Sequence, residues 1–254
     1  MKKKVLGYIA LHYGSDYLAY AIRSMYDSVD EILILYCERP SHAADNGVPC
    51  PETEAELMDI ARSVDPDGKI KWMDGNWKQE NAQRNYAHEY AALNGFNVLV
   101  TTDADEVWTD KKTLDDLIQL TFDRKAKSCL VHMRHLWRSF NLICDDGMRQ
   151  ERLHYIGADR GDLIYAEQKY NMVWHFGYAR KPSAIYYKIG IHGHSAEWLI
   201  PKEQWFQTKF MPFPPAQATH PCCAGVWYPA AFDKTELPEM MREHPYYNLE
   251  VIND

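Results

Sequence analysis

The sequence predicts an α/β fold, in which a mixed, mainly parallel sheet is flanked by helices and followed by an antiparallel, loop-rich half. Over residues 1–110, short apolar runs alternate with helical patterns, which is typical of a parallel sheet. The run EILILYCE at residues 31–38 is apolar almost throughout, as expected of a strand covered on both faces. After Asp110 this alternation loosens, and the pattern becomes that of antiparallel strands and loops.

The elements of the first half follow one another at regular spacing. Strands are expected at residues 5–11, 31–38, 69–74 and 96–105, and helices at residues 15–29, 52–64 and 77–95. Ser15 is the candidate N-cap of the first helix, where Leu18, Ile22 and Met25 recur at helical spacing, and Gly95 is expected to end the third. Ligands of parallel sheets bind at the carboxyl ends of the strands, so the residues after each strand are the first candidates for chemistry.

The second half is predicted in less detail. Residues 112–123 read as a short helix with Thr113 as a possible cap, and residues 128–139 alternate like an antiparallel strand. Strands or short helices are expected at residues 161–177 and 184–194, followed by a Pro-rich, aromatic wrap. Because no boundary resembles a flexible linker, residues 1–110 and 111–254 are expected to be two halves of one domain.

Composition excludes several classes of protein. A chain of 254 residues with 46% hydrophobic content can bury roughly 70–75% of its unfolded surface. The net charge of −8 argues against nucleic acid as the main partner or acceptor. Six cysteines without CxxC spacing indicate reduced thiols in a cytoplasmic protein. The apolar run after Lys2–Lys4 is too short for a signal peptide, and no run approaches the ~20 apolar residues that span a bilayer.

Three acids at the end of the fourth strand, Asp103, Asp105 and Glu106, are the main candidates for chemistry. In an extended backbone, Asp103 and Asp105 would point the same way. Two such carboxylates suit a hard cation such as Mg²⁺ or Mn²⁺, which in turn can hold a diphosphate. An isolated DxD sequence is also common in solvated turns, so the neighbouring sequence must decide between a metal site and such a turn.

The helix before these acids supports a phosphate site. Its apolar stripe is expected to comprise Ala82, Tyr86, Tyr90 and Leu93, and its polar face Asn81, Arg84, Asn85 and His88. The helix begins at the carboxyl end of a strand, where its N-terminus favours anionic groups. An Arg in its first two turns could contact a phosphate.

These residues carry a family resemblance. The segment NAQRNYAHEYAALNGFNVLVTTDADEVW, residues 81–108, resembles the glycosyltransferase family 2 pattern, in which an Arg-Asn pair on a helix precedes a strand and an aspartate motif. The wider class is the nucleotide-sugar-dependent glycosyltransferases of Rossmann-like GT-A fold. Residues 8–35 resemble their opening strand–helix–strand, where the nucleoside docks, so Tyr8 and Ala10 are expected there. The match covers about residues 4–110.

The resemblance implies roles for single residues. Asp105 would be the main ligand of Mn²⁺ or Mg²⁺, and Asp103 would touch the ribose or a metal-bound water. A His from the second half would complete the metal site, with His175 the first candidate, His194 the second and His192 the third. Arg84 and Asn85 would hold the diphosphate.

Base recognition and acid–base catalysis are predicted less sharply. Glu38 or Asp74 would recognise the base, and Asp74 has the better context because Trp77 is near enough to stack on the base. The general base is left open between Asp159, Asp162 and Glu151, because the acid pair usual in the family is not recognisable. Aromatic residues of the second half are expected to shape the acceptor side, namely Trp137, Trp174, Tyr178, Trp198 and Trp205.

The resulting prediction is a metal-assisted, inverting glycosyltransferase that moves a sugar from a UDP- or GDP-sugar to a carbohydrate or other hydroxyl acceptor. One alternative is a nucleotidyltransferase that forms a nucleotide sugar. It would want a Gly-rich signature with a basic residue near the N-terminus, which LHYGSDY does not supply. The other is a carbohydrate- or nucleotide-binding protein without turnover.

Overall fold

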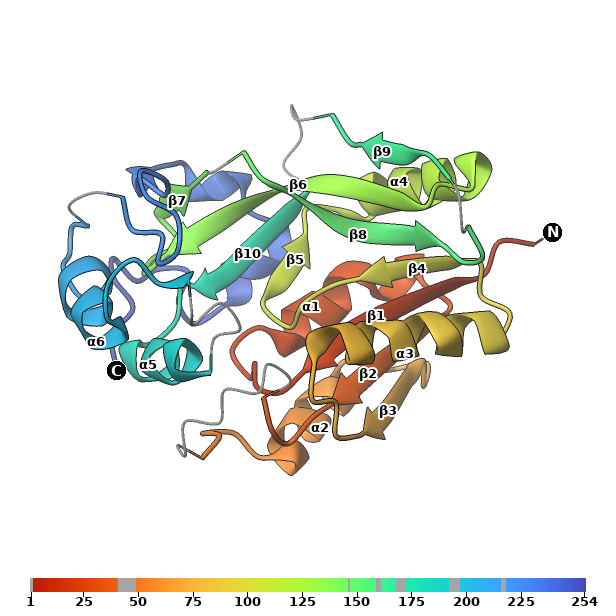
Figure 1. The fold of residues 1–254 in the computed structure, drawn as a ribbon, viewed down its shortest axis with the longest axis horizontal. Coiled ribbons are helices and arrows are strands. Elements are labelled where there is room, and N and C mark those ends of the chain that lie inside the picture. The colour runs from red at the N-terminus through yellow and green to blue at the C-terminus, as the bar shows by residue number, and fades with distance from the viewer. Residues whose placement is uncertain are drawn as a thin grey trace.

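The strands of both halves join in one mixed sheet in the computed structural model, which describes residues 2–40, 49–145, 147–158, 161–167, 172–191, 197–215 and 218–254 (Figure 1). The strands are β1 (Val5–Leu11), β2 (Glu31–Tyr36), β3 (Ile70–Asp74), β4 (Val98–Thr101), β5 (Glu106–Trp108), β6 (Ser128–Trp137), β7 (Leu142–Cys144), β8 (Arg149–Tyr155), β9 (Leu163–Tyr165), β10 (Val173–Tyr178) and β11 (Ala230–Ala231). The helices are α1 (Leu18–Met25), α2 (Glu54–Ser63), α3 (Glu80–Leu93), α4 (Lys111–Arg124), α5 (Pro182–Gly190) and α6 (Lys202–Trp205).

The first half forms the parallel part of the sheet. Strands β3, β2, β1 and β4 lie side by side in that order and all run parallel. Next to β4 the direction reverses, because β8 pairs antiparallel with β4 and β6 pairs antiparallel with β8. Strand β10 then returns parallel to β6. The predicted α/β fold with a mainly parallel sheet and an antiparallel continuation is confirmed.

Helices cover both faces of the parallel strands, as the apolar run in β2 requires. On one face, α1, α2 and α4 pack against side chains such as Ile9, Ile34 and Val100. On the other face, Ala87 and Ala91 of α3 pack against residues of β1, β2 and β4. Figure 1 shows α3 lying across this sheet on the viewer's side. Successive residues of a strand therefore serve two different cores.

Two predicted caps differ from the structure. Helix α1 begins at Leu18, and Ser15 does not cap it because its hydroxyl donates to Glu52. Helix α4 is longer than predicted and is capped by Asp110, whose carboxylate accepts from the Thr113 amide at 2.7 Å. Asp110 precedes the helix in extended backbone, the usual geometry of an N-cap.

The buried stripe of α3 is rotated from the predicted one. Gln83, Ala87 and Ala91 are buried, whereas Leu93 is 86% exposed. Gln83 tolerates burial because its side-chain amide donates to the Leu35 carbonyl at 2.8 Å. The helix ends as predicted, with Gly95 at φ +73° just after it.

None of the helices in the described ranges is long and apolar enough to cross a membrane.

Candidate active site

A cavity of about 590 Å³ opens just beyond the carboxyl ends of β1, β2 and β4. This is the position at which parallel α/β sheets bind ligands. The first half contributes residues that follow those strands, together with Glu80 and Arg84 of α3. The second half closes the cavity with side chains from β6, β8, β10 and α5, of which the polar ones are His135, Gln150, Arg152, His175 and Lys188.

Asp103 and Asp105 both line this cavity, but from a tight turn rather than from an extended strand. The Glu106 amide donates to the Asp103 carbonyl at 3.0 Å and closes the turn. The Phe176 amide of β10 donates to the Asp105 carbonyl at 2.8 Å and ties the turn to the second half. The two carboxylates therefore meet different sets of neighbours.

Asp103 belongs to a buried network centred on Arg152. The Arg152 guanidinium lies 3.0 Å from Asp103 and also pairs with both carboxylate oxygens of Glu106. Arg152 and Glu106 have side chains only 6% and 1% exposed. Arg84, which also pairs with Glu80, approaches Asp103 to 3.8 Å.

The pKa values follow from this arrangement. Burial alone would raise the pKa of Asp103, but Arg152 and Arg84 outweigh it and hold that pKa below its usual range. Burial raises the pKa of Glu106, and the Arg152 guanidinium opposes that rise. Since both acids depend on one guanidinium, removal of Arg152 should lower the free energy of unfolding strongly.

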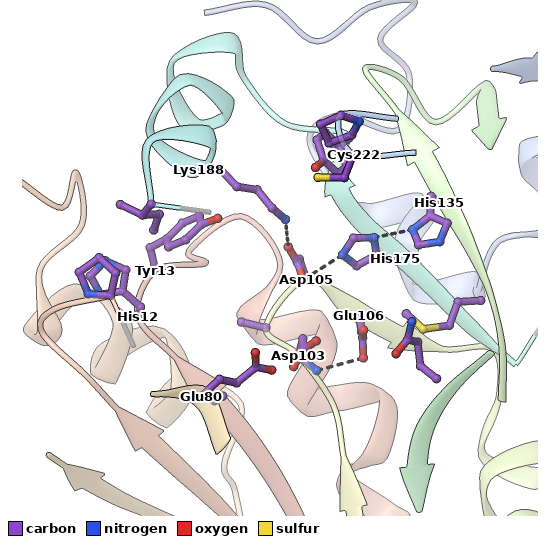
Figure 2. A pocket seen from close by; sticks show the side chains of 18 of the residues that line it. His12, Tyr13, Glu80, Asp103, Asp105, Glu106, His135, His175, Lys188 and Cys222 are labelled. Atoms are coloured by element: carbon purple, nitrogen blue, oxygen red, sulfur yellow. Dashed lines mark hydrogen bonds and ion pairs between the residues drawn. The ribbon is translucent and has the colours of Figure 1, made fainter. Parts of the chain in front are cut away.

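Asp105 instead faces β10 and α5 (Figure 2). The Lys188 ammonium donates to one of its carboxylate oxygens at 3.1 Å, and His175 Nε2 lies 3.5 Å from the other. His175 Nδ1 contacts His135 Nδ1 at 2.8 Å, so one of these rings must donate to the other. The result is a row from α5 to β6 through Lys188, Asp105, His175 and His135.

Burial and charge act in opposite directions on this row. Burial would raise the pKa of Asp105, but Lys188 and then His175 outweigh it and hold that pKa well below its usual range. Burial lowers the pKa of His175 to about 4, although Asp105 opposes the change. Near neutral pH, Asp105 is therefore ionised and His175 is neutral.

A second cavity of about 830 Å³ lies beyond the ends of β2 and β3 and is lined by Glu38 and Asp74. His12 lines the first cavity and Tyr187 the second, and they hydrogen-bond at 2.7 Å. The two cavities are therefore neighbours. Trp77 does not line the second cavity, since its ring packs on Gly75 and Tyr86.

The remaining predicted residues are spread more widely. Ala10 and Arg84 line the first cavity. Tyr8 is buried against α3, and Asn85 is exposed beside the cavity without lining it. Glu151 is exposed on β8, between Gln150 and Arg152, which do line it. Asp162 pairs with Arg124 at 2.8 Å on the surface. Three predicted residues lie outside the described residues, namely Asp159, His192 and His194.

The aromatic acceptor wall predicted from the sequence is wrong for most of its members. Trp137, Trp174 and Trp205 are at most 1% exposed and pack within hydrophobic clusters. Tyr178 does line the cavity, and Trp198 packs against a cluster at its edge. The rings of Trp137, Trp174 and Trp205 therefore contribute to the core of the second half.

Sequence reasoning missed Arg152, Lys188 and Glu197, which all line the cavity. No local motif marks them, because each is brought in from a distant part of the chain. For Arg152 the alternation along β8 was available as a signal, since Gln150 and Arg152 share one face. Without knowing which face β8 turns inward, that signal does not select a residue.

A divalent cation would need carboxylate oxygens that the protein's own cations already engage. Asp105 lies against Lys188, and Asp103 against Arg152 and Arg84. Among the described residues, no group of three or more His, Cys, Asp or Glu side chains could hold a metal ion. As arranged here, these side chains do not fit a divalent cation. The Mn²⁺ or Mg²⁺ predicted from the sequence stays a prediction.

Solved structures with a similar fold include transferases that use nucleotides. A mannosyltransferase from Pyrobaculum calidifontis, in complex with GDP-Man and Mn²⁺, has a TM-score of 0.48 and 12% identity, over 75% of this chain and 61% of that chain. This chain thus spans less than two thirds of that mannosyltransferase. A cytidylyltransferase from Leptospira borgpetersenii serovar Hardjo-bovis has a TM-score of 0.41 and 11% identity, over 99% of both chains.

A third similar structure is 4-diphosphocytidyl-2C-methyl-D-erythritol synthase from Anaerococcus prevotii, with a TM-score of 0.34 and 13% identity, over 80% of this chain and 81% of that chain. No protein-family model and no curated protein matches the sequence. The likeness concerns the fold alone, and glycosyl transfer and nucleotidyl transfer both occur among these neighbours.

Proposed function

We propose that the protein transfers a glycosyl group from a nucleoside diphosphate sugar to a hydroxyl acceptor. One observation carries the proposal: Arg84, Arg152 and Lys188 converge with Asp103 and Asp105 on a cavity at the carboxyl ends of parallel strands. Three fixed cations in one cavity suit an anionic diphosphate. The acids hold those cations in place and partly offset their positive charge.

The two neighbouring cavities suggest how such a donor would lie. The nucleoside would occupy the second cavity, where Glu38 and Asp74 can accept hydrogen bonds from a base or a ribose. The diphosphate would then enter the first cavity past Pro40, which lines both. The sugar and the acceptor would meet beside the turn that carries Asp103 and Asp105.

The reaction would be a displacement with inversion at the anomeric carbon. The acceptor oxygen forms a bond to that carbon, while the bond from the carbon to the diphosphate oxygen breaks and its electron pair leaves with the diphosphate. Arg84 and Lys188 would stabilise the charge that develops there. The acceptor's proton must pass to a base in the cavity.

For that base we propose Glu197. Asp103 and Asp105 also line the cavity, but neighbouring cations hold their pKa values below the usual range. Glu80 pairs with Arg84, and Glu106 is buried against Arg152. Glu197 is an exposed residue on the wall formed by the second half, where an acceptor would approach. Glu197→Gln should lower kcat while leaving nucleoside diphosphate binding unchanged.

One contact disfavours nucleotidyl transfer. Backbone amides near the start of α1 could hold the triphosphate of that reaction. Here the amides of Gly14 and Ser15 donate to the Glu52 carboxylate at 2.6 and 2.9 Å. A carboxylate of the protein thus already accepts from these two amides.

The test is a panel of UDP- and GDP-sugars, with and without simple sugar acceptors, in which released nucleoside diphosphate is measured. We expect release with one donor, and a loss of at least about a hundredfold in Asp105→Asn, since Lys188 and His175 lose their shared carboxylate. Pyrophosphate release from a nucleoside triphosphate and a sugar phosphate would instead establish nucleotidyl transfer. Nucleotide binding without either product would establish a binding protein.

A further inference from the structure

The cation beside Asp105 is Lys188, which comes from a distant part of the chain. Lys188 lies near the end of α5, and its ammonium reaches the Asp105 carboxylate across 83 residues of sequence (Figure 2). The two side chains are only 15% and 14% exposed. Because both side chains are largely buried, the surrounding protein fixes the geometry of this salt bridge, unlike that of an ion pair at the surface.

Gly177 provides the space for this contact. A Cβ at that position would lie 2.5 Å from the Lys188 ammonium and 2.5 Å from the His175 ring. Any other residue would therefore force one or both of these groups to shift from this arrangement. Tyr178, the next residue, places its ring 5.2 Å from the same ammonium and lines the cavity beside it.

The ammonium also faces the cavity. Lys188 is one of its lining residues, and an ammonium has three N–H donors, of which one goes to Asp105. The remaining donors can bind oxygen atoms of a ligand. A divalent cation at Asp105 would have to displace the ammonium, or share the site with it at a separation where two positive charges repel strongly.

We propose that Lys188 supplies the positive charge that faces the donor's diphosphate, so that this site binds nucleoside diphosphate without a divalent cation. This inference rests on the proposed function and makes it more specific. Asp105 then serves to hold and orient the ammonium, and Asp103 to hold the guanidinium groups of Arg84 and Arg152. The aspartates position protein cations instead of ligating a metal.

Isothermal titration calorimetry on the intact chain tests this, with UDP, GDP, ADP, CDP and dTDP as probes, in excess EDTA and in Mn²⁺. We expect at least one of them to bind in EDTA with an affinity within about threefold of that in Mn²⁺. Lys188→Met should weaken binding in EDTA by about ten- to a hundredfold, the loss typical of a charge-assisted hydrogen bond. Lys188→Arg should retain most of the affinity, because it keeps the charge.

Lys181→Met is the matched control, since Lys181 is exposed at the start of the same helix and does not line the cavity. It should bind like the unmodified protein. Binding by the unmodified protein only when Mn²⁺ or Mg²⁺ is present would overturn the inference and leave the proposed function standing. Binding of none of these probes under either condition would overturn both. Because that comparison uses the unmodified chain, it decides even where Lys188→Met does not fold.

Discussion

The two aspartates of the Asp103–Asp105 turn lie two residues apart, yet they depend on different regions of the molecule. Asp103 pairs with Arg152 of β8 and lies near Arg84 of α3. Asp105 pairs with Lys188 of α5 and lies against His175 of β10. Both arrangements tie the turn to the second half of the chain, the first through β8 and the second through β10 and α5.

This difference gives the two regions separate tasks. The Arg152–Glu106 pair is nearly inaccessible to solvent, so it should matter most for stability. Both groups line the cavity, but the side chains of the Lys188–Asp105–His175 row are 14–16% exposed, so this row should matter more for ligand binding than for stability. Substitutions on each side can show whether stability and binding separate in this way.

The largest effect on stability should come from Arg152→Met. It leaves Glu106 buried without its partner, and breaking one side of a buried ion pair costs about 3–5 kcal/mol. Urea unfolding followed by circular dichroism measures the loss. Arg124→Met is the control, because its partner Asp162 is 64% exposed. Loss of this surface ion pair should lower the free energy of unfolding by less than about 1 kcal/mol. Equal losses in the two variants would contradict the separation.

The fold of the first half was largely predictable from its sequence, and for a physical reason. Strand and helix periods are local properties, so the four parallel strands were found close to their predicted positions. The orientation of α3 was not predictable, because it depends on which hydrogen-bond acceptors and apolar side chains the sheet presents to the helix. Gln83 is buried since the Leu35 carbonyl can accept its amide, and no pattern within α3 contains that information.

The candidate site divides in the same way. Arg84, Asp103 and Asp105 stand within one contiguous segment, and they do line one cavity. Arg152 and Lys188 lie 49 and 83 residues beyond the acids that they neutralise, with no motif at either position. Only the pairing of β8 with β4 and of β10 with β5 brings those regions together. Such pairing is a property of the whole fold, so the sequence could not assign these partners.

Acid should affect the Asp105 region through His175. Its pKa is lowered to about 4 by burial, against 6.5 for the ordinary side chain. Between these values the unfolded chain binds a proton that the folded protein does not, so stability is lost as the pH falls from about 6.5 to 4. The full loss is roughly 3 kcal/mol. The charged and titratable groups facing His175 are Asp103, Asp105, His135, Arg152 and Lys188.

His175→Asn tests this expectation, because it removes the titrating group and keeps a polar side chain. The free energy of unfolding, measured in urea at a series of pH values, should fall less steeply between pH 6.5 and 4 than in the unmodified protein, by about one proton. His154 also has a pKa lowered to about 4, mainly by burial, and it lies outside the cavity. Its variant His154→Gln should flatten the same slope without affecting ligand binding.

A smaller loss of stability, with a clear loss of binding, is expected for Gly177→Ala. The added methyl group would collide with Lys188 and His175, and overpacking of this kind costs about 1–3 kcal/mol. Displacement of Lys188 should weaken nucleoside diphosphate binding by about tenfold. In the control Gly68→Ala, the new Cβ meets nothing within 4 Å, although φ is +67°. It should lose stability through the backbone alone and bind normally.

The smallest effects should come from Glu151→Gln and Asp162→Asn, which change two residues that the sequence offered as the general base. Neither lines the cavity: Glu151 is exposed on β8, and Asp162 pairs with Arg124 on the surface. Turnover should stay within about twofold, and stability within about 1 kcal/mol, as for exposed ion pairs. Glu197→Gln, measured beside them, should lower kcat alone. A large loss of kcat in Glu151→Gln would identify Glu151 as the base and remove Glu197 from that role.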